Sequence, residues 1–479
     1  MTPQAKRLAA SLGSWTAPAG LCASDGLCTV GANATLLYTG NVLFWYYTTT
    51  SAGSPAVLLN PITLTGTDVT LPYSEDIFCS GTSVMPDGRV LVTGGNPLPD
   101  TCQPNIPCGT SHANIFDPAT STWSQAAEMN YARWYPSNVQ MPDGTTLVMA
   151  GPDAWGSLVP QMESYNETTN VWTALPSSAN YPGGDTYPRL SVLTTGLVFK
   201  SENLQQTYTF NALKNSWSLL GNTNFGNRYF GGSVMLPGLK RILIAGGSSI
   251  AANGTGAATN TAEVIDFTAK TPAWTYTGSL NYARMNENLV LLPNGSVLAV
   301  GGGAGYGKYS NPVEQAELYS PSTGKWTVMA AQTAQRTYHS TAVLLPDGRV
   351  ISAGSDWGTL ETTYEIYSPP YLFAGSRPTI TSAPASVTYG SNFVIDTPDY
   401  ASISSVALMR AGSTTHADNF DQRYVSLTFT NTGNNTVTAT APANANLAPP
   451  GYYLLVIVNR SGVPSVMPFV QVSKGSHGS

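Results

Sequence analysis

Charged residues are scarce in this chain of 479 amino acids. Only 10% of its residues are Asp, Glu, Lys or Arg, against about 25% in typical soluble domains. The 21 basic and 27 acidic side chains give a formal net charge of −6, and the basic ones form no cluster. Because nucleic-acid binding depends on clustered Lys and Arg, we expect no nucleic acid partner. No apolar run approaches the roughly 20 residues of a membrane-spanning helix, so we expect no membrane insertion.

Helical periodicity is also missing. Apolar residues do not recur at intervals of three and four over any useful length, which argues against long amphipathic helices. The chain instead holds 46 Gly, 34 Pro and many Ser, Thr and Asn residues, the composition of a protein built from short strands and turns. We therefore predict an all-β fold, and the length allows two or three domains.

Cysteine is rare, and the five cysteines are an odd number. Cys22 and Cys28 are separated by five residues, as are Cys102 and Cys108, and both spacings suit small disulfide loops in an oxidising compartment. Cys79 is left over. It is either a buried thiol that packs as a small apolar side chain or a functional thiol.

Six Asn-x-Ser/Thr sequons agree with secretion and glycosylation. They begin at Asn33, Asn166, Asn253, Asn294, Asn434 and Asn459. The segment from Met1 to Gly20 lacks the apolar core of a signal peptide. We therefore expect a secreted glycoprotein whose leader sequence has been removed, and we expect it to be a monomer.

An aromatic residue precedes a tryptophan by seven positions at five places. The pairs are Phe116 and Trp123, Tyr165 and Trp172, Phe210 and Trp217, Phe267 and Trp274, and Tyr319 and Trp326. The tryptophans lie 45 to 57 residues apart, near the kelch period of about 50 residues. Each unit reads as four short strands, so we predict a seven-bladed kelch-type β-propeller. The expected blades are 31–75, 76–127, 131–176, 180–221, 225–278, 283–330 and 335–372.

The two ends of the propeller are predicted from different signals. The last blade lacks the aromatic–tryptophan pair, and a strand from about Leu12 to Pro18 is expected to complete it and close the ring. After Arg377-Pro378 the sequence changes to short strands of alternating polarity, typical of an immunoglobulin-like β-sandwich. The predicted domains are therefore 1–375, the propeller, and 376–479, the sandwich.

Five turn prolines at the far end of the repeated strand give a ruler along the chain. They are Pro86, Pro142, Pro237, Pro293 and Pro346. Seven residues before them stand, in order, Cys79, Tyr135, Phe230, Asn286 and His339. If the segments are one repeated strand, these residues occupy equivalent places around the channel. With Tyr338 beside His339, the ring holds a thiol, two phenols and an imidazole, a set that core packing would not select.

This set of side chains suits a copper ion. Nitrogen and oxygen donors in a tetragonal arrangement favour Cu(II). Tyr135, Tyr338, His339 and, from a polar loop of the second domain, His416 would supply two phenols and two imidazoles. The pKa of a tyrosine is about 10, so it binds as a phenolate only where a cation stabilises the anion. A sulfur from Cys79 bonded to the Tyr135 ring would make that phenol easier to oxidise, and metal and radical together would oxidise an alcohol and reduce O2.

Four separated motifs carry a resemblance to a known family. They are Asp76-Ile77-Phe78-Cys79, Ala132-Arg133-Trp134-Tyr135-Pro136-Ser137, Arg336-Thr337-Tyr338-His339-Ser340, and Thr415-His416 followed by Asp421-Gln422-Arg423. In this order they resemble the copper radical oxidases, which include galactose oxidase and glyoxal oxidase, from about Asp76 to Val472.

The resemblance implies a residue set and a reaction. It implies one copper ion held by Tyr135, Tyr338, His339 and His416, with Tyr135 carrying the radical and joined to Cys79 by a thioether. Tyr338 would be the base that removes the substrate's hydroxyl proton. The substrate would be a primary alcohol, a sugar or a small aldehyde, oxidised by O2 with release of H2O2.

Substrate contacts are predicted at three positions. Trp155 lies near the place of the family's stacking tryptophan, and its alternative is packing on an outer strand. Arg228 and Phe230 are expected to face the substrate, and their alternative is hydrogen bonding and packing within the channel. Tyr187-Pro188 repeats Tyr135-Pro136 in the next blade; we assign the radical to Tyr135 because Arg133-Trp134 precedes it.

One alternative function stays open at this point. A kelch propeller can keep its fold and only bind a glycan or a protein partner, because fold does not determine function. Such a scaffold would have no use for Cys79, Tyr135, Tyr338, His339 and His416 together. Their joint presence favours the copper-dependent oxidase.

Overall fold

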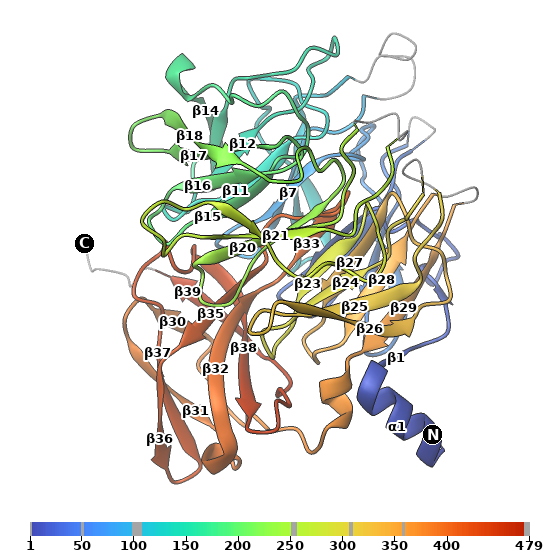
Figure 1. The fold of residues 1–479 in the computed structure, drawn as a ribbon. Helices are drawn as coiled ribbons and strands as arrows, with labels where there is room; N and C mark the ends of the chain where they lie inside the picture. The colour runs from blue at the N-terminus through green and yellow to red at the C-terminus, as the bar shows by residue number, and fades with distance from the viewer. Residues whose placement is uncertain are drawn as a thin grey trace.

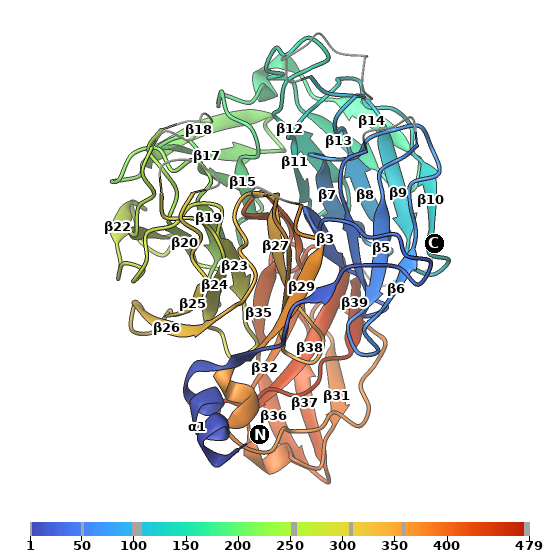
Figure 2. The same ribbon diagram turned by 90° about the vertical axis from the view of Figure 1, so that its right-hand side faces the viewer.

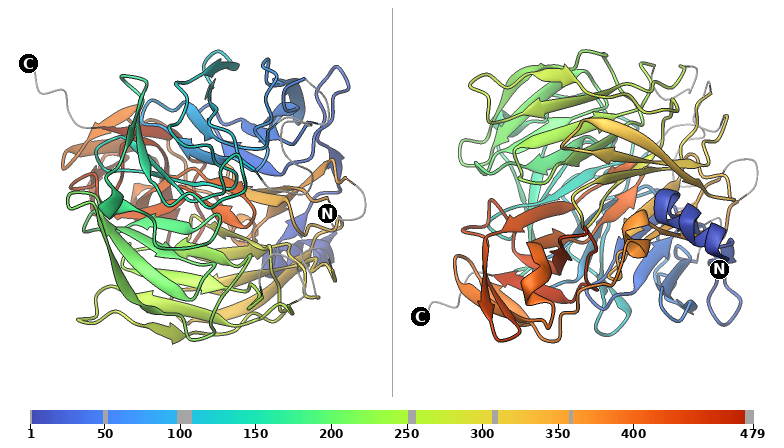
Figure 3. Two further views of the ribbon diagram at one scale, coloured as in Figure 1. Left: turned by 90° about the horizontal axis from the view of Figure 1, so that it is seen from above. Right: turned by 60° about the horizontal axis from the view of Figure 1, so that its bottom comes forward.

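The computed structural model describes residues 2–48, 52–97, 108–250, 256–305, 310–356 and 360–473. Within these ranges, seven small antiparallel sheets surround a channel, and two further sheets form a C-terminal unit (Figure 1). Seen from above, the seven sheets follow one another around the centre of the molecule (Figure 3). The fold is thus a seven-bladed β-propeller followed by a β-sandwich, as predicted.

Five of the seven sheets have four strands, each in chain order from the channel outward. The second and third contain β7 (Gly81–Val84), β8 (Val90–Thr93), β9 (Ala113–Asp117) and β10 (Thr122–Gln125), and β11 (Ser137–Gln140), β12 (Thr146–Met149), β13 (Glu163–Asn166) and β14 (Val171–Ala174). The fourth contains β15 (Arg189–Val192), β16 (Val198–Ser201), β17 (Gln206–Asn211) and β18 (Ser216–Asn222), preceded by a 3₁₀ turn η1 (Ser177–Ala179). The fifth and sixth contain β19 (Gly232–Met235), β20 (Arg241–Ala245), β21 (Ala262–Asp266) and β22 (Trp274–Tyr276), and β23 (Asn288–Leu291), β24 (Val297–Val300), β25 (Gln315–Ser320) and β26 (Lys325–Ala331).

The tryptophan repeat marks the outermost strands. Trp123, Trp172, Trp217 and Trp326 pair directly with the aromatic residue seven positions earlier, across the hairpin between the third and fourth strands. In the fifth blade Trp274 pairs with Ile265 instead, and Phe267 packs against Phe199. The spacing therefore indicates a hairpin with a cross-strand aromatic pair in four blades and a variant of it in the fifth.

The turn that served as a ruler has the expected structure. At Pro86-Asp87-Gly88 the amide of Gly88 donates to the Met85 carbonyl (2.9 Å), and the Asp87 carboxylate accepts from the Arg89 amide (2.9 Å). Gly88 has φ 90°, a conformation that favours glycine. The turn returns the chain from the channel strand to the second strand of the blade.

The seventh blade is closed by the N-terminal segment, as predicted. Its sheet contains β27 (Ser340–Leu344), β28 (Val350–Gly354), β29 (Thr363–Ser368) and β1 (Ser14–Trp15), and β2 (Ala19–Gly20) also pairs with β29. Trp15 lies opposite Tyr367, with ring centroids 4.9 Å apart, and its indole N–H donates to the Ala330 carbonyl (2.9 Å). This strand joins the first and last parts of the ring and covers a sheet edge.

A short helix, α1 (Pro3–Leu12), precedes this strand and was not expected. Thr2 caps it by accepting from the Ala5 amide (3.2 Å), and Gly13 ends it with φ 72°. Ala5, Leu8, Ala9 and Leu12 recur at helical spacing, but the run is only ten residues long, too short to be recognised as an amphipathic helix in the sequence. Ala9 is buried whereas Leu8 is exposed. It lies beside the 3₁₀ turn η2 (Pro370–Phe373), as the right-hand view of Figure 3 shows.

The first blade is a six-stranded sheet because the C-terminal unit adds to it. Its own strands are β3 (Asn33–Leu36), β4 (Val42–Trp45), β5 (Ala56–Asn60) and β6 (Thr65–Asp68). On the channel side, β33 (Ser413–Thr415) pairs with β3, and β34 (Asp418–Asn419) pairs with β33. We call Ser413–Asn419 the finger. β33 also lies against β7 and β27, so the finger enters the centre of the ring (Figure 1).

The remaining C-terminal strands form the sandwich below the propeller (Figure 2). One sheet has the order β30 (Ser386–Thr388), β39 (Phe469–Ser473), β38 (Gly451–Asn459), β32 (Ile403–Arg410) and β35 (Arg423–Leu427). The other has the order β31 (Asn392–Asp396), β37 (Thr436–Thr440) and β36 (Phe429–Gly433), and η3 (Tyr400–Ser402) precedes β32. The sandwich core, with Leu408 and Val437, is continuous with Met235 and Ile242 of the fifth blade. This shared core fixes the sandwich to the propeller.

Disulfide and surface predictions have mixed outcomes. Cys22 and Cys28 form the predicted disulfide, whereas Cys102 lies outside the described residues, so the second loop stays a prediction. The sequon at Asn33 is wrong as a glycosylation site, because Asn33 is buried in β3. Asn253 is outside the described residues, and Asn166 and Asn434 are exposed. Among the described residues, no helix has the length and apolar character needed to cross a membrane.

Candidate metal centre

The residues found with the turn ruler share an unusual backbone conformation at the mouth of the channel. All five have a left-handed φ: Cys79 61°, Tyr135 58°, Phe230 60°, Asn286 64° and His339 62°. Residues other than glycine seldom adopt this region, and each instance costs of order 1–3 kcal/mol unless the surrounding structure enforces it. Its recurrence at one position of five blades confirms that these residues are equivalent.

Backbone hydrogen bonds join these positions from blade to blade. The Tyr135 amide donates to the Cys79 carbonyl (2.9 Å), and the Asn286 amide donates to the Phe230 carbonyl (2.7 Å). The structure adds Tyr187 of the fourth blade, whose amide donates to the Tyr135 carbonyl (3.0 Å) and whose φ is 47°. The ruler missed Tyr187 because this blade turns at Thr194-Thr195-Gly196 and has no turn proline.

Side chains from four distant parts of the chain meet at this place. The phenol oxygens of Tyr135 and Tyr338 are hydrogen bonded to each other. His416 Nε2 lies 3.0 Å from the Tyr135 oxygen and 3.8 Å from Cys79 Sγ. The donor atoms of Cys79, His339 and His416 lie within 4.8 Å of one another, a grouping that could hold a metal ion. All five side chains are buried, the most accessible being Tyr135 at 9%.

The finger fixes the tautomer of His416. The Thr415 hydroxyl donates its only hydrogen to the Ala32 carbonyl (2.8 Å). His416 Nδ1 lies 2.6 Å from the same hydroxyl oxygen, so Nδ1 must carry the hydrogen and donate it. The lone pair of His416 is therefore on Nε2, the atom that faces Tyr135 and Cys79.

His339 is fixed in the same sense by a carboxylate. Its Nδ1 lies 2.5 Å from Asp356 Oδ2, and a carboxylate only accepts hydrogen bonds. Nδ1 therefore donates, and Nε2 is the nitrogen available as a ligand. The rings of His339 and His416 lie 4.5 Å apart and nearly perpendicular, at 82°. Both imidazoles thus present Nε2 as a neutral donor within one small volume.

The phenols need a cation to ionise. Burial raises the pKa of Tyr135 well above its usual value, and the neighbouring Cys79 and Tyr338 raise it further. The Cys79 thiol lies within hydrogen-bonding reach of the same phenol. Without a positive charge Tyr135 therefore stays protonated. Two imidazole nitrogens, two phenol oxygens and one sulfur form a donor set that suits copper, whose charge would stabilise a phenolate.

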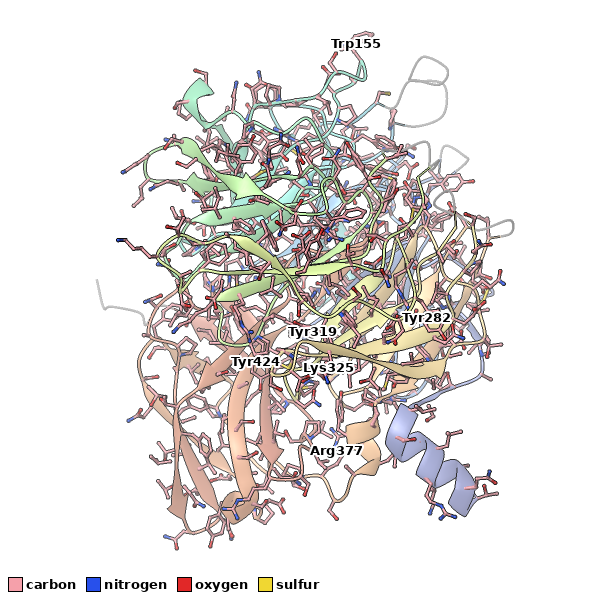
Figure 4. All side chains as sticks on the ribbon, viewed as in Figure 1. Trp155, Tyr282, Tyr319, Lys325, Arg377 and Tyr424 are labelled. Atoms are coloured by element: carbon pink, nitrogen blue, oxygen red, sulfur yellow. A yellow bond between two sulfur atoms is a disulfide. The ribbon has the colours of Figure 1, made fainter. Side chains whose placement is uncertain are left out.

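Aromatic rings enclose Tyr135. Trp134 stacks on it with centroids 3.8 Å apart and planes 17° apart, and Tyr187 stacks at 4.7 Å and 25°. Trp155 is 76% exposed and lies at the upper edge of the molecule in Figure 4. The ring contacts of Tyr135 among the described residues thus include Trp134 and not Trp155. A substrate contact of Trp155 stays a prediction.

The other two predicted substrate residues have different surroundings. Phe230 is partly buried and presents its edge to the Tyr338 ring at 5.7 Å and 80°, so it belongs to the wall of the site. Arg228 is buried, and its guanidinium donates to Glu263 (2.8 Å) and to the carbonyls of Gly246 and Thr261. These bonds lie within the fifth blade, which is the alternative role considered for Arg228.

The same buried arginine–glutamate pair recurs in other blades. The pairs are Arg133 and Glu163, Arg284 and Glu317, and Arg336 and Glu365. Each arginine precedes the left-handed residue by two or three positions and binds carbonyls of its own blade. This repetition indicates that Arg228 holds its blade together.

Arg189 is a functional position that the sequence did not reveal. Its guanidinium donates to the carbonyls of His416 (2.9 Å), Tyr187 (2.8 Å) and Gly231 (3.1 Å). It also lies 3.7 Å from Asp418 of the finger. Arg189 therefore clamps the fourth and fifth blades to the tip of the finger. No local motif marks it, because its partners are backbone atoms from distant segments.

Two family models match consecutive parts of the chain. The model described as "Glyoxal oxidase N-terminus" matches residues 56–371, and the model "Galactose oxidase-like, Early set domain" matches residues 377–472. A galactose oxidase from Gibberella zeae is 29% identical over 485 residues, which cover 91% of this chain and 68% of the relative. The aldehyde oxidase GLOX from Vitis pseudoreticulata is 30% identical over 452 residues, which cover 84% of this chain and 83% of the relative.

A solved structure is similar over almost the whole chain. It is a fungal alcohol oxidase of the AA5 family in complex with copper, with a TM-score of 0.83 and 25% sequence identity. The superposition covers 96% of this chain and all of that one.

Proposed function

The chain belongs to the glyoxal oxidase family of copper radical oxidases, and from this we propose how its own residues build and use the metal centre. It is a copper-dependent oxidase that acts on an alcohol or aldehyde with O2. The proposal concerns the role of each residue, the thioether and the range of substrates.

Four residues are proposed as the copper ligands: the Nε2 atoms of His339 and His416 and the phenol oxygens of Tyr135 and Tyr338. The observation that carries this assignment is their convergence at the mouth of the channel, with Nδ1 of each histidine engaged elsewhere. Bound copper would supply the charge that stabilises a phenolate and one of two one-electron redox centres. Because the ligands all come from one chain, we propose that the protein acts as a monomer.

Cys79 is proposed to be joined to the Tyr135 ring by a thioether. Forming this carbon–sulfur bond removes the thiol hydrogen and one ring hydrogen, a two-electron oxidation for which O2 is the acceptor. The position of the Cys79 thiol beside the Tyr135 phenol supports the assignment. The sulfur and the stacked rings of Trp134 and Tyr187 would lower the energy needed to form a phenoxyl radical at Tyr135.

Tyr338 and Tyr135 divide the two hydrogens of the substrate. Tyr338 accepts the proton of the substrate hydroxyl, and the Tyr135 radical accepts a hydrogen atom from the adjacent carbon. The proton and the hydrogen atom carry away one electron between them, and the second would pass to bound copper. Loss of two hydrogens and two electrons in total converts a primary alcohol to an aldehyde, or a hydrated aldehyde to an acid. O2 then takes up two protons and two electrons and leaves as H2O2. The two phenol oxygens are close enough to be hydrogen bonded to each other, which supports their action on one substrate molecule.

The domain division and the location of the protein are also proposals. We place the boundary at 375/376, which agrees with family models that end at 371 and begin at 377. The sandwich then donates His416 to a propeller that carries the other ligands. Secretion is proposed because the disulfide between Cys22 and Cys28 requires an oxidising compartment.

Peroxide release and intact mass test the proposal together. The copper-loaded chain is assayed against primary alcohols, sugars and small aldehydes, with Cys79→Ser as the matched control that cannot form the thioether. We expect peroxide from at least one class, and a reduced chain lighter than its sequence mass by two hydrogen atoms. An unmodified mass together with wild-type turnover of Cys79→Ser would exclude the crosslink. Absence of peroxide with every class would contradict the residue roles.

A further inference from the structure

Asp356 is the nearest charged group to a proposed copper ligand. Its Oδ2 accepts from His339 Nδ1 (2.5 Å), and the Tyr46 hydroxyl donates to the same oxygen (3.3 Å). The Asp356 side chain is only 14% exposed, so water screens this contact weakly. Phe78 covers the His339 ring edge-on at 4.9 Å and the Tyr46 ring at 5.1 Å. Tyr46, Phe78, His339 and Asp356 thus form one packed group.

The backbone delivers Asp356 to this position rigidly. Ser340 and Gly354 are the end pair of the β27–β28 ladder, so His339 and Ser355 leave the sheet side by side. The Ser355 hydroxyl accepts from the Thr337 amide (3.1 Å), and this bond holds the segment before β27 beside the segment after β28. Asp356 follows directly. The His339–Asp356 contact is therefore built into the seventh blade and does not depend on a long loop.

The two proposed histidine ligands differ in the group that accepts the hydrogen bond from Nδ1. His339 donates to a carboxylate, whereas His416 donates to the neutral hydroxyl of Thr415. A hydrogen bond to an ionised acceptor is roughly twice as strong as a neutral one. It draws the Nδ1 hydrogen away from the ring and raises the basicity of the ligand nitrogen. Nε2 of His339 is then the more electron-rich donor of the two.

We propose that Asp356, supported by Tyr46, is a positioning residue that makes His339 the stronger imidazole ligand and stabilises Cu(II) relative to Cu(I). This inference rests on the proposed function and deepens it. Asp356 acts through His339 and has no part in the proton and hydrogen transfers assigned to Tyr338 and Tyr135. A more basic donor stabilises the higher charge of Cu(II), so Asp356 lowers the reduction potential of the copper and tightens Cu(II) binding.

The central test is Asp356→Asn, which keeps the shape of the side chain and removes its charge. We expect Cu(II) affinity, measured by competition with a coloured chelator, to fall by roughly 10- to 100-fold, the usual effect of losing an outer-shell partner. The copper reduction potential should rise, and the copper EPR spectrum should change. The melting temperature of the metal-free variant should stay near that of the wild type. Unchanged affinity, potential and EPR spectrum would overturn the proposal.

Two variants separate charge from packing. Tyr46→Phe keeps the His339–Asp356 bond and the charge of Asp356, and it should change the potential by a smaller amount than Asp356→Asn does. Thr415→Val removes the neutral partner of His416 and should shift the potential less than Asp356→Asn does. An equal or larger shift in Thr415→Val would show that the carboxylate has no special role.

A measurement on the wild type keeps the proposal testable if Asp356→Asn does not fold. Pulsed EPR detects the remote nitrogen of each copper-bound imidazole, whose signal depends on its hydrogen bond. Two distinct remote nitrogens are expected, one bonded to a carboxylate and one to a hydroxyl; two equivalent ones would overturn the inference. If the wild type binds no copper, the proposed function is wrong. If it binds copper but Asp356→Asn changes neither copper affinity nor the reduction potential, only this inference is wrong.

Discussion

Arg189→Met should uncouple the finger from the propeller and weaken copper binding. The wild-type side chain is buried and donates to three backbone carbonyls, one of them that of His416. Methionine fills much of the same space and makes none of these bonds. His416 has a left-handed φ of 51°, which persists only while its surroundings hold it. Loss of Arg189 removes one of those constraints.

The size of the effect follows from the charge and the hydrogen bonds that Arg189 brings to this place. Removing one partner of a buried charged pair costs about 3–5 kcal/mol, because the carbonyls lose their donor and Asp418, 3.7 Å away, loses its opposite charge. For a chain of 479 residues, whose unfolding entropy is about 1 kcal/mol/K, that corresponds to a melting temperature lower by roughly 3–5 °C. Relaxation of His416 should in addition lower Cu(II) affinity by more than about tenfold, the usual minimum for disturbing a ligand's support.

Arg284→Met is the matched control for this experiment. Arg284 is also fully buried and paired with Glu317 (2.8 Å), but its bonds stay within the sixth blade. It should lose similar thermal stability, measured by calorimetry of the metal-free protein, while the folded variant keeps wild-type copper affinity. Equal losses of copper affinity in both variants, or wild-type behaviour of Arg189→Met, would refute the role given to Arg189.

Four shorter predictions accompany this one. Tyr338→Phe should still bind copper, as measured by EPR, but its turnover should fall by roughly 10²- to 10⁴-fold, the usual contribution of a proton acceptor. Peroxide release at the wild-type rate would contradict the role of Tyr338 as that acceptor. Trp134→Phe should raise the potential of the Tyr135 radical in a spectroelectrochemical titration, whereas Trp155→Phe should leave it unchanged. The copper-loaded protein should melt at a higher temperature than the chelator-treated protein, and the difference should grow with the concentration of free copper. A melting temperature that does not depend on copper concentration would exclude copper binding to the folded state. The hydrogen bond with Glu75 raises the pKa of His112, so this pair stabilises the fold below the ordinary histidine pKa of 6.5 and stops doing so as pH rises through the raised pKa. Because the contact is half-exposed, the free energies of unfolding of wild type and His112→Asn, measured by urea titration, should differ by less than about 1 kcal/mol at low pH. The two values should converge at high pH.

Repetition made the propeller predictable from the sequence. Each of the aromatic–tryptophan pairs and each turn proline is a weak signal alone, but a fixed spacing between copies places every blade in register. The same register predicted that Cys79, Tyr135 and His339 meet, since equivalent positions of a ring face one channel. The helix α1 was not predicted because its apolar stripe spans only ten residues between the caps Thr2 and Gly13.

The sequence did not predict contacts between segments that share no repeat or motif. Counting back from the turn prolines does not reach Tyr187, because a threonine stands in place of the proline; only the Tyr-Pro pair marks it as the counterpart of Tyr135. Trp134 was read only as part of a motif, although its stacking on the adjacent Tyr135 follows from the left-handed turn at that residue. Arg189 binds His416, 227 residues away, and Asp356 binds His339 across the β27–β28 hairpin. No motif in the sequence marks either pair.

The metal centre and the assembly of the two domains form one thermodynamic unit. His416 reaches the channel only because β33 pairs with β3 in one register, with Thr415 opposite Asn33 and Ser413 opposite Thr35. The hydroxyls of Thr35 and Ser413 (2.8 Å) fix that register further. A slip of one residue would turn Thr415 to the opposite face of the strand, and His416 would lose the partner that fixes its tautomer. If copper binds all four proposed ligands, docking of the finger strengthens copper binding by some free energy. By thermodynamic linkage, bound copper must stabilise the docked finger by that same free energy.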